Sequence, residues 1–314
     1  MIQEHALALA LALVLDFFLG DMESLPHPVR WMGQAYARFE RMVRREKAFT
    51  YENGMTAVLL IVVLFSVVPG AILYLIPPGM VHVAVEGFLL YWCLSVKTLA
   101  DESFSVYQAL QKKRLPLARQ LLARVVGRDT QKLPPSEIAR GVVETLGESF
   151  VDGFLSPIFW GLILGAPGAY FFKAVSTGDS MIGHPEEPYR RFGWAAARLD
   201  DALNWIPARL CVLFLVPAAL VCGQSPRGLL RAFKKDRLKH ASPNAAHGEA
   251  AFAGALGVRL GGVNYYGGKT YRQAFLNPTG RACEARDILR GVSLLWVSAL
   301  GVLLMLLLLG GVSI

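Results

Sequence analysis

"MTAVLLIVVLFSVVPGAILYLI", residues 55–76, decides the class of this protein. The stretch contains no Asp, Glu, Lys, Arg or His. A helix of about 20 apolar residues crosses the hydrocarbon core of a bilayer. A second stretch of the same character, "GVSLLWVSALGVLLMLLLL", lies at residues 291–309 near the other end of the chain. The sequence therefore predicts an integral membrane protein.

Weaker apolar stretches lie between these two, at residues 6–20, 81–96, 154–172 and 208–222. Helices satisfy their own backbone hydrogen bonds inside lipid. We therefore predict an all-α integral membrane protein with about 5–6 apolar spans and helical cytoplasmic loops. The stretch 154–172 is interrupted by "GAPG" at residues 165–168. Gly and Pro there favour a re-entrant hairpin, in which two half-helices enter the membrane and return.

The net charge of +8 follows this topology and does not indicate nucleic-acid binding. Basic residues are concentrated in three polar segments, 21–54, 97–152 and 224–290. The positive-inside rule places these segments in the cytoplasm. Segment 174–206 holds three arginines against five acidic residues, so charge barely constrains it, and the predicted hairpin favours a cytoplasmic position. No repeat or long linker divides the chain, and we predict one polytopic domain, 1–314.

Carboxylates recur every four residues on a predicted helix after Pro135, at Glu144, Glu148 and Asp152. They share one helix face, where like charges destabilise an isolated helix. Two interpretations stay open. Arg140 pairs with Glu144 on a solvated face, or the stripe binds Mg²⁺, which takes carboxylate and phosphate oxygens.

"RLDDALNWIPAR", residues 198–209, repeats this mixture of charges between apolar stretches. On a helix ended by Pro207, Asp200 shares a face with Asn204 and Asp201 with Trp205, and Arg198 and Arg209 bracket the stretch. Carboxylates beside arginines suit a metal–phosphate site. A purely structural Arg–Asp network is the equal alternative.

Other polar residues interrupt apolar surroundings. We predict that "KAVSTGDSMIGH", residues 173–184, joins the hairpin to the polar loop, with Lys173 either snorkelling or neutralising a phosphate. Asp16 lies inside the first predicted span, and Asp21, His27 and Arg30 follow it. "VNYYGGKT", residues 263–270, misses the Walker A spacing by one residue and follows no strand pattern. We interpret it as a glycine-rich turn whose amides are able to meet an anion.

Six blocks of this sequence together resemble the CobD/CbiB family, adenosylcobinamide-phosphate synthase of cobalamin biosynthesis. They are, in order, "LDFFLGDMESLPHPVRWMG" (15–33), "VGRDT" (126–130), "VVETLGESFVDGFLSPIFW" (142–160), "KAVSTGDSMIGH" (173–184), "YRRFGWAAARLDDALNWIPARL" (189–210) and "SPNAAHGEAAFAGALGVRLGGVNYYGG" (242–268). The resemblance runs from about residue 14 to residue 280. The chain departs from the family pattern at Ser149, usually Asn, and at Ala246-His247-Gly248, usually a Gly-Trp-Pro-like run.

The resemblance implies an ATP- and Mg²⁺-dependent amide ligase in the cell (inner) membrane. It would join adenosylcobyric acid to 1-aminopropan-2-ol or its O-phosphate, giving adenosylcobinamide or its phosphate. Expected partners are the lipid bilayer and downstream cobalamin-assembly enzymes, but not nucleic acid. A cytoplasmic active site is expected, with segments 97–152 and 224–290 forming the corrinoid platform.

The expected roles of the polar residues follow from this chemistry, because ATP turns a carboxylate oxygen into a leaving group and the protein supplies position and charge. The expected Mg²⁺ ligands are Glu144, Glu148, Asp152, Asp200 and Asp201. The expected phosphate-binding residues are Lys173, Arg198, Asn204 and Arg209. Asp179 or His184 would take the proton of the attacking amine, although a loop histidine is more often simply exposed. Further candidates are Asp16, Asp21, His27 and Arg30.

Two other functions remain open on the sequence. The first is a membrane Mg²⁺-dependent prenyltransferase, although the Asp200–Asp201–Asn204 pattern only approximates its Asp-rich motif. The second is a non-enzymatic AmpE-like membrane sensor or transporter.

Overall fold

The computed structural model describes residues 1–21, 26–46 and 48–311. Contacts between residues group the chain into two compact units, each built from discontinuous segments. The first unit comprises Met1–Ser95, Asp152–Asn204 and Leu303–Ile314, and the second comprises Val96–Val151 and Trp205–Val302. The expectation of one polytopic domain stays a prediction.

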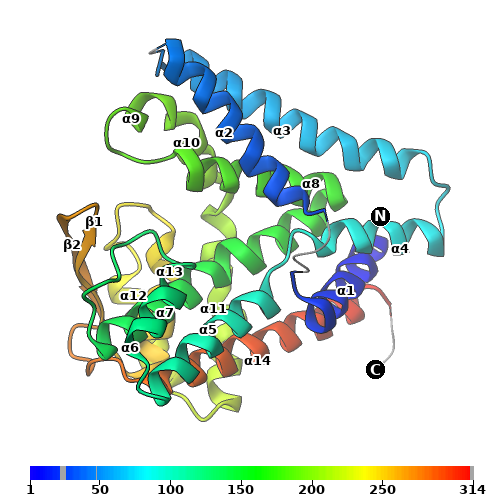
Figure 1. Cartoon of the computed structure of the whole chain (residues 1–314). Coiled ribbons are helices and arrows are strands. Elements are labelled where there is room, and N and C mark those ends of the chain that lie inside the picture. The colour runs from blue at the N-terminus through cyan, green and yellow to red at the C-terminus, as the bar shows by residue number, and fades with distance from the viewer. Residues whose placement is uncertain (22–25, 47, 312–314) are drawn as a thin grey trace. The chain divides into compact units, whose positions relative to one another are not determined.

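The described residues of the first unit are helical wherever they form regular structure (Figure 1). Its elements are α1 (Ile2–Leu19), α2 (Pro28–Glu46), α3 (Tyr51–Tyr74), α4 (Met80–Tyr91), most of the π-helix η1 (Phe150–Leu155), α8 (Ser156–Ile182), α9 (Tyr189–Phe192) and α10 (Trp194–Leu203). Helix α8 is its centre, because α1, α2, α3, α4 and α10 all pack against it.

Helix α8 reverses direction at Gly165, as the "GAPG" motif predicts. Gly165 has φ 67° and ψ −159°, which no L-residue adopts without strain. A Cβ atom added to Gly168 would lie 2.5 Å from the carbonyl oxygen of Trp160. In a straight helix, residues eight positions apart are separated by about 12 Å. The segment is therefore a hairpin of two half-helices.

A buried carboxylate caps the second half-helix of this hairpin. The Glu86 side chain on α4 is 1% exposed, and its Oε1 accepts a hydrogen bond from the amide of Ala166 at 3.0 Å. His5 Nδ1 on α1 lies 2.9 Å from the same oxygen. Residues from three helices thus stabilise the backbone break, where unpaired amides in an apolar environment would be unfavourable.

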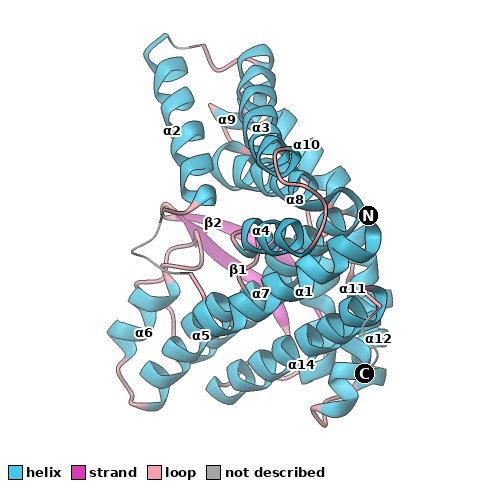
Figure 2. Ribbon diagram, turned by 90° about the vertical axis from the view of Figure 1, so that its right-hand side faces the viewer, coloured by secondary structure: helices cyan, strands magenta, loops and turns pink. Residues whose placement is uncertain are grey.

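The second unit combines helices with one β-hairpin (Figure 2). Its elements are α5 (Val96–Gln111), α6 (Leu115–Leu122), α7 (Pro135–Ser149), α11 (Trp205–Val221), α12 (Pro226–Asp236), α13 (Ala245–Leu256), β1 (Leu260–Tyr266), β2 (Lys269–Leu276) and the first part of α14 (Ala285–Leu309). Helix α13 is buried from Ala246 to Leu256 and packs against α7, α11 and α12.

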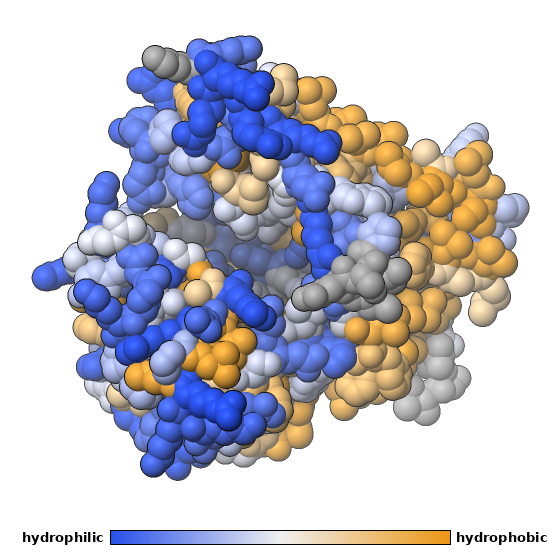
Figure 3. Space-filling model, in the orientation of Figure 1, coloured by the Kyte–Doolittle hydropathy of each residue, from blue (hydrophilic) through white to orange (hydrophobic). Residues whose placement is uncertain are grey.

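The predicted all-α membrane class is confirmed, and the β1–β2 hairpin is an addition to it. Five helical stretches are long and apolar enough to span a membrane: Ile2–Leu19, Tyr51–Tyr74, Met80–Gln111, Pro135–Ile182 and Ala285–Leu309. Trp194–Leu203 and Trp205–Val221 together would form a sixth. Exposed apolar side chains cover the outward face of α3, including Leu60, Leu64 and Val67, and Figure 3 shows this surface in orange. Lipid would cover such a surface.

Three local predictions were wrong. A strand, β1, does lead into the glycine-rich turn, and it pairs antiparallel with β2. Helix α10 ends at Leu203, so Pro207 lies in the first turn of α11, where its missing N–H needs no partner. Segment 173–182 is the last part of α8 and not a connecting loop.

Candidate active site

The candidate site of the second unit begins where α7 and α13 cross. The two helices approach closely because glycines, Gly147 and Gly248, lie at the contact. A Cβ atom on Gly147 would be only 2.7 Å from the Cα of Glu249. Small residues let helix backbones come this close. The crossing places Glu148 and Glu249, each the next residue after one of these glycines, beside the contact.

Glu144 on α7 is held by two guanidinium groups. Its Oε2 lies 2.8 Å from Arg128 Nη1, and its Oε1 lies 3.1 Å from Arg140 Nη1. The amide of Gly261 at the start of β1 also donates to Oε1, at 2.8 Å. All three side chains are buried, with Glu144 9% exposed. Two cations and an amide compensate the loss of water around this carboxylate.

Asn264 on β1 connects the two arginines to the hairpin. Its Oδ1 accepts from Arg128 Nη1 at 2.6 Å and from Arg140 Nη2 at 2.8 Å. Its Nδ2 donates to Gln273 Oε1 on β2 at 2.9 Å. The hydrogen-bonded network fixes the Arg128 guanidinium, whose Nε is buried without a partner among the described residues.

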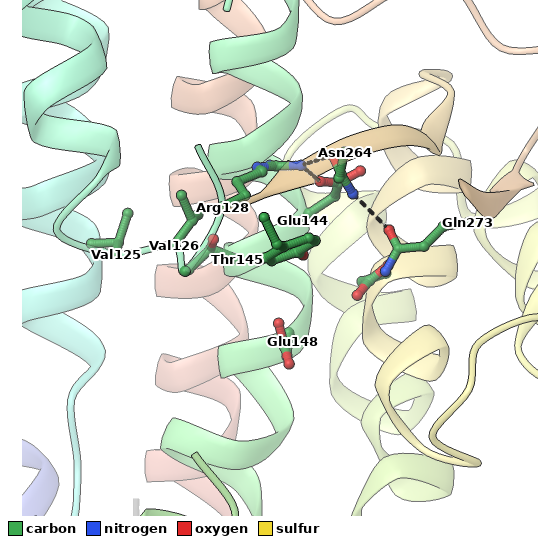
Figure 4. A pocket seen from close by; sticks show the side chains of 11 residues that line it. Val125, Val126, Arg128, Glu144, Thr145, Glu148, Asn264 and Gln273 are labelled. Atoms are coloured by element: carbon green, nitrogen blue, oxygen red, sulfur yellow. Dashed lines mark hydrogen bonds and ion pairs between the residues drawn. The ribbon is translucent and has the colours of Figure 1, made fainter. Parts of the chain in front are cut away.

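A cavity of about 150 Å³ lies beside this network (Figure 4). Its polar lining includes Arg128, Glu144, Thr145, Glu148, Glu249 and Gln273. Glu148 is exposed, and Figure 4 shows it one turn along α7 from Glu144. Pockets for whole drug-sized ligands span roughly 300–1,000 Å³. The cavity therefore suits a phosphate group or a reacting carboxylate better than an entire nucleotide or corrinoid.

The carboxyl group of Glu249 has a strongly raised pKa in this cavity. Burial raises the pKa of its carboxyl well above the usual range, and the nearby carboxylates of Glu148 and Glu144 raise it further. The guanidiniums of Arg128 and Arg140 oppose this shift only in part. A divalent cation would relieve the repulsion between these acids.

The comparisons with known proteins agree over most of the chain. The model of the family described as "CobD/Cbib protein" matches residues 9–295. The cobalamin biosynthesis protein CobD of Desulfotalea psychrophila is 40% identical over 301 residues, which cover 90% of this chain and 91% of that protein. CobD of Clostridium perfringens is 36% identical over 306 residues, covering 93% and 94%. CbiB of Salmonella typhi is 40% identical over 299 residues, covering 93% of each.

The chain belongs to the CobD/CbiB family. No solved structure matches it. The six sequence blocks that carry the resemblance all lie within the matched region, 9–295. The blocks "VGRDT" and "SPNAAHGEAAFAGALGVRLGGVNYYGG" contribute Arg128, Glu249 and Asn264 to the site.

The predicted metal ligands fall in both units. Glu144 and Glu148 lie in the second unit and share the cavity, whereas Asp152, Asp200 and Asp201 lie in the first. Asp152 lies in the π-helix η1, whose wider turn interrupts the four-residue stripe. Among the described residues, no group of three His, Cys, Asp or Glu side chains has metal-binding geometry. The Arg140–Glu144 ion pair does exist, as the structural interpretation of this stripe expects.

Asp200 and Asn204 share a face in the first unit, as predicted. Asn204 Nδ2 donates to Asp200 Oδ2 at 2.9 Å, and its Oδ1 accepts from Ser156 Oγ at 2.5 Å. Asn204 is 1% exposed, and the nearby Leu203 carbonyl accepts from the Trp160 indole at 3.1 Å. These contacts connect the end of α10 to the first half-helix of α8.

The remaining candidates of the first unit are dispersed over several elements. Lys173 and Asp179 are half-buried on the second half-helix of α8, and Arg198 on α10 is exposed. His184 is exposed and contacts the Tyr189 ring edge-to-face at 5.5 Å. Their roles stay predictions.

In the N-terminal block, His27 Nε2 lies 3.3 Å from Asp21 Oδ1. The His27 ring also meets Trp92 edge-to-face at 5.0 Å. Asp16 is fully buried, and Arg30 is exposed. No ligand chemistry follows from these contacts.

Arg209 lies in the second unit, on α11. Its guanidinium stacks over the Trp205 ring at 4.1 Å and lies 3.4 Å from Asn244 Oδ1. Arg209 and Arg237 both act electrostatically on His247 of α13. Burial and these two guanidiniums lower the pKa of His247 to about 4, so its ring is neutral at pH 7.

The sequence analysis missed Glu249, Asn264, Gln273 and the cavity role of Arg128. Glu249 stands alone in an Ala- and Gly-rich stretch, and no periodic pattern marks it. Arg128 lies inside the quoted block "VGRDT", but the ion pair with Glu144 depends on the fold and not on the spacing.

Proposed function

We propose that this chain acts in cobalamin biosynthesis as an ATP-dependent amide ligase. It would join adenosylcobyric acid to 1-aminopropan-2-ol or its O-phosphate and release adenosylcobinamide or its phosphate. Family membership supports the pathway, since relatives that match most of the chain are named as cobalamin biosynthesis proteins. The multi-pass character supports a membrane location. The inner membrane and a cytoplasmic site are parts of the proposal.

The cavity beside Glu144 is the observation that carries the chemical part of the proposal. In the proposed reaction the carboxylate oxygen attacks the γ-phosphorus of ATP and releases ADP, and the amine then displaces inorganic phosphate from the acyl phosphate and loses a proton. Each stage places extra negative charge in the site. The fixed guanidinium of Arg128, with its unpaired buried Nε, offers a donor for that charge.

Glu148 and Glu249 are the residues that would hold Mg²⁺ here. Mg²⁺ is usually bound through one or two carboxylates together with substrate phosphates. The two side chains line one cavity, and burial first, then the neighbouring carboxylates of Glu148 and Glu144, raise the pKa of Glu249. Bound Mg²⁺ would neutralise phosphate charge. Glu144, already bonded to two guanidiniums and an amide, is better suited to positioning Arg128.

The other roles are proposed without a contact that selects among them. Asp179 or His184 would accept the proton of the attacking amine. Lys173, Arg198 and Asn204 would contact phosphate groups, and Asp152, Asp200 and Asp201 remain further metal candidates. Membrane attachment would keep the product available to downstream cobalamin-assembly enzymes.

The test is a mass spectrum of the corrinoid after incubation of detergent-purified protein with adenosylcobyric acid, MgATP and either amine. The expected result is a mass increase equal to one condensed amine, absent without ATP. Glu148→Gln and Glu249→Gln should each lower the rate by about 100-fold. Asp101→Asn, an exposed carboxylate on α5 paired with Lys97, is the matched control and should leave the rate unchanged. No mass increase with either amine would refute the ligase.

A further inference from the structure

A second polar cluster in the second unit lies outside the cavity. It comprises Arg209 on α11, Arg237 at the end of α12, and His247 in the first turn of α13. The Arg237 guanidinium lies 5.3 Å from the centre of the Phe233 ring. The His247 ring meets Phe233 edge-to-face at 5.4 Å. These aromatic contacts fix the directions of Arg237 and His247, as Trp205 does for Arg209.

His247 is a buried polar side chain without a partner. The residue is 0% exposed, and neither ring nitrogen has a hydrogen bond within the part of the chain that the structure describes. Nε of Arg237 is likewise buried without a hydrogen-bond partner among the described residues. A neutral imidazole has one donor and one acceptor. Buried groups of this kind normally have partners, so each exception asks for an explanation.

The two arginines also lack a counter-charge. Neither Arg209 nor Arg237 forms an ion pair with a described carboxylate, and the side-chain hydrogen-bond partners of Arg209 are the Trp205 carbonyl and the neutral Asn244 side chain. Arg237 is half-buried, as is Arg209. Two guanidiniums close enough to interact electrostatically repel each other when no acid lies between them, and an anion bound there would replace this repulsion by attraction.

The start of α13 adds to the same positive region. This helix of 12 residues begins at Ala245, and its N-cap residue, Asn244, makes no side-chain capping bond. The His247 amide donates to the Asn244 carbonyl at 2.9 Å, and the positive end of the helix dipole favours anions. The arginines, the unpartnered histidine and the helix start thus converge from three elements.

We propose that Arg209, Arg237 and His247 form a binding site for a phosphate group, separate from the cavity lined by Glu148 and Glu249. The guanidiniums donate to the phosphate oxygens, and the His247 N–H donates a further bond. The phosphate belongs either to a soluble phosphate monoester or to a phospholipid headgroup. The site does not depend on the proposed ligase activity.

The test follows the His247 ring in the full-length protein, labelled with ¹⁵N-histidine and purified in dodecyl maltoside. The chain has six histidines, and His247→Gln assigns the signal. Inorganic phosphate is titrated without ATP or corrinoid. We expect a saturable shift of the His247 nitrogens. Arg209→Gln and Arg237→Gln should weaken binding about tenfold or more, whereas Arg231→Gln, an exposed arginine of α12, should not.

A second arm distinguishes the sources of the phosphate. The same spectra are recorded in phosphatidylcholine nanodiscs with and without phosphatidylglycerol. A shift with inorganic phosphate supports a soluble ligand, and a shift only with phosphatidylglycerol supports a lipid headgroup. No shift in either arm would overturn the site, and so would an equal shift in the Arg209→Gln and Arg237→Gln proteins. The wild-type titration decides alone if those variants do not fold.

Discussion

Replacing Gly147 with Ala should separate α7 from α13. The added Cβ would lie 2.7 Å from Glu249 Cα and 2.8 Å from Glu249 N. Carbon atoms in contact prefer about 3.5–4.0 Å, so one backbone must move by about 1 Å. The neighbouring atoms belong to a buried helix and not to a flexible side chain. Overpacking of this kind destabilises a protein by about 1–3 kcal/mol, and here it also displaces a carboxylate of the cavity.

The assay is thermal unfolding in detergent, followed by circular dichroism, together with the rate of amine condensation. Gly301→Ala is the matched control, because a Cβ atom there meets nothing within 4 Å on a helix of the same unit. Removing a helical glycine should stabilise by about 0.5–1 kcal/mol. Equal melting temperatures for Gly147→Ala and Gly301→Ala, with an unchanged rate, would show that the Gly147 contact does not set the site.

Three further changes probe other contacts. Glu249→Gln should raise the melting temperature in Mg²⁺-free buffer at pH 8, because the pKa of Glu249 is raised in the folded state and the wild type loses stability as the pH rises above the unfolded pKa of about 4.3. The gain in melting temperature should vanish below about pH 4.3, and an equal gain at about pH 4 would argue against a raised pKa. Gly165→Ala should destabilise the α8 hairpin by about 1–3 kcal/mol or more, through backbone strain and a clash with Glu86, and an unchanged melting temperature would contradict the reversal. Asp129→Asn should speed hydrogen exchange in peptide 260–276, because Asp129 accepts from the amides of Gly267 and Gly268 at 3.2 and 2.7 Å; unchanged exchange would mean that these bonds do not hold the turn.

The membrane architecture could be predicted because bilayer physics acts on long, local patterns. Every apolar stretch recognised in the sequence is mainly helical in the structure, and the break at Gly165 follows from Gly and Pro inside such a stretch. A buried partner for Glu86 could also be predicted, since an ionisable residue within an apolar stretch usually has one.

The β-hairpin and most of the cavity depended on weaker signals. Gly267-Gly268 between aromatic and β-branched residues is a β-hairpin pattern. The comparison with Walker A considered only phosphate binding by this turn and not the pairing of the strands on either side of it. The cavity joins residues as far apart as Arg128 and Asn264, which are 136 positions apart. No period or spacing expresses such a pairing, because it arises only when α7, α13 and the hairpin pack together.

The turn at Gly267-Gly268 has a consequence for nucleotide recognition. A glycine-rich loop binds phosphate only if its N–H groups are available, and here both already bond to Asp129, a residue of the same chain. The internal carboxylate takes the position that a phosphate would need. A search for nucleotide sites by glycine pattern would therefore select a loop whose two glycine amides are already occupied. The ATP of the proposed reaction would meet donors other than these two amides, so point mutations of the cavity arginine Arg128 should affect nucleotide affinity more than mutations of these glycines.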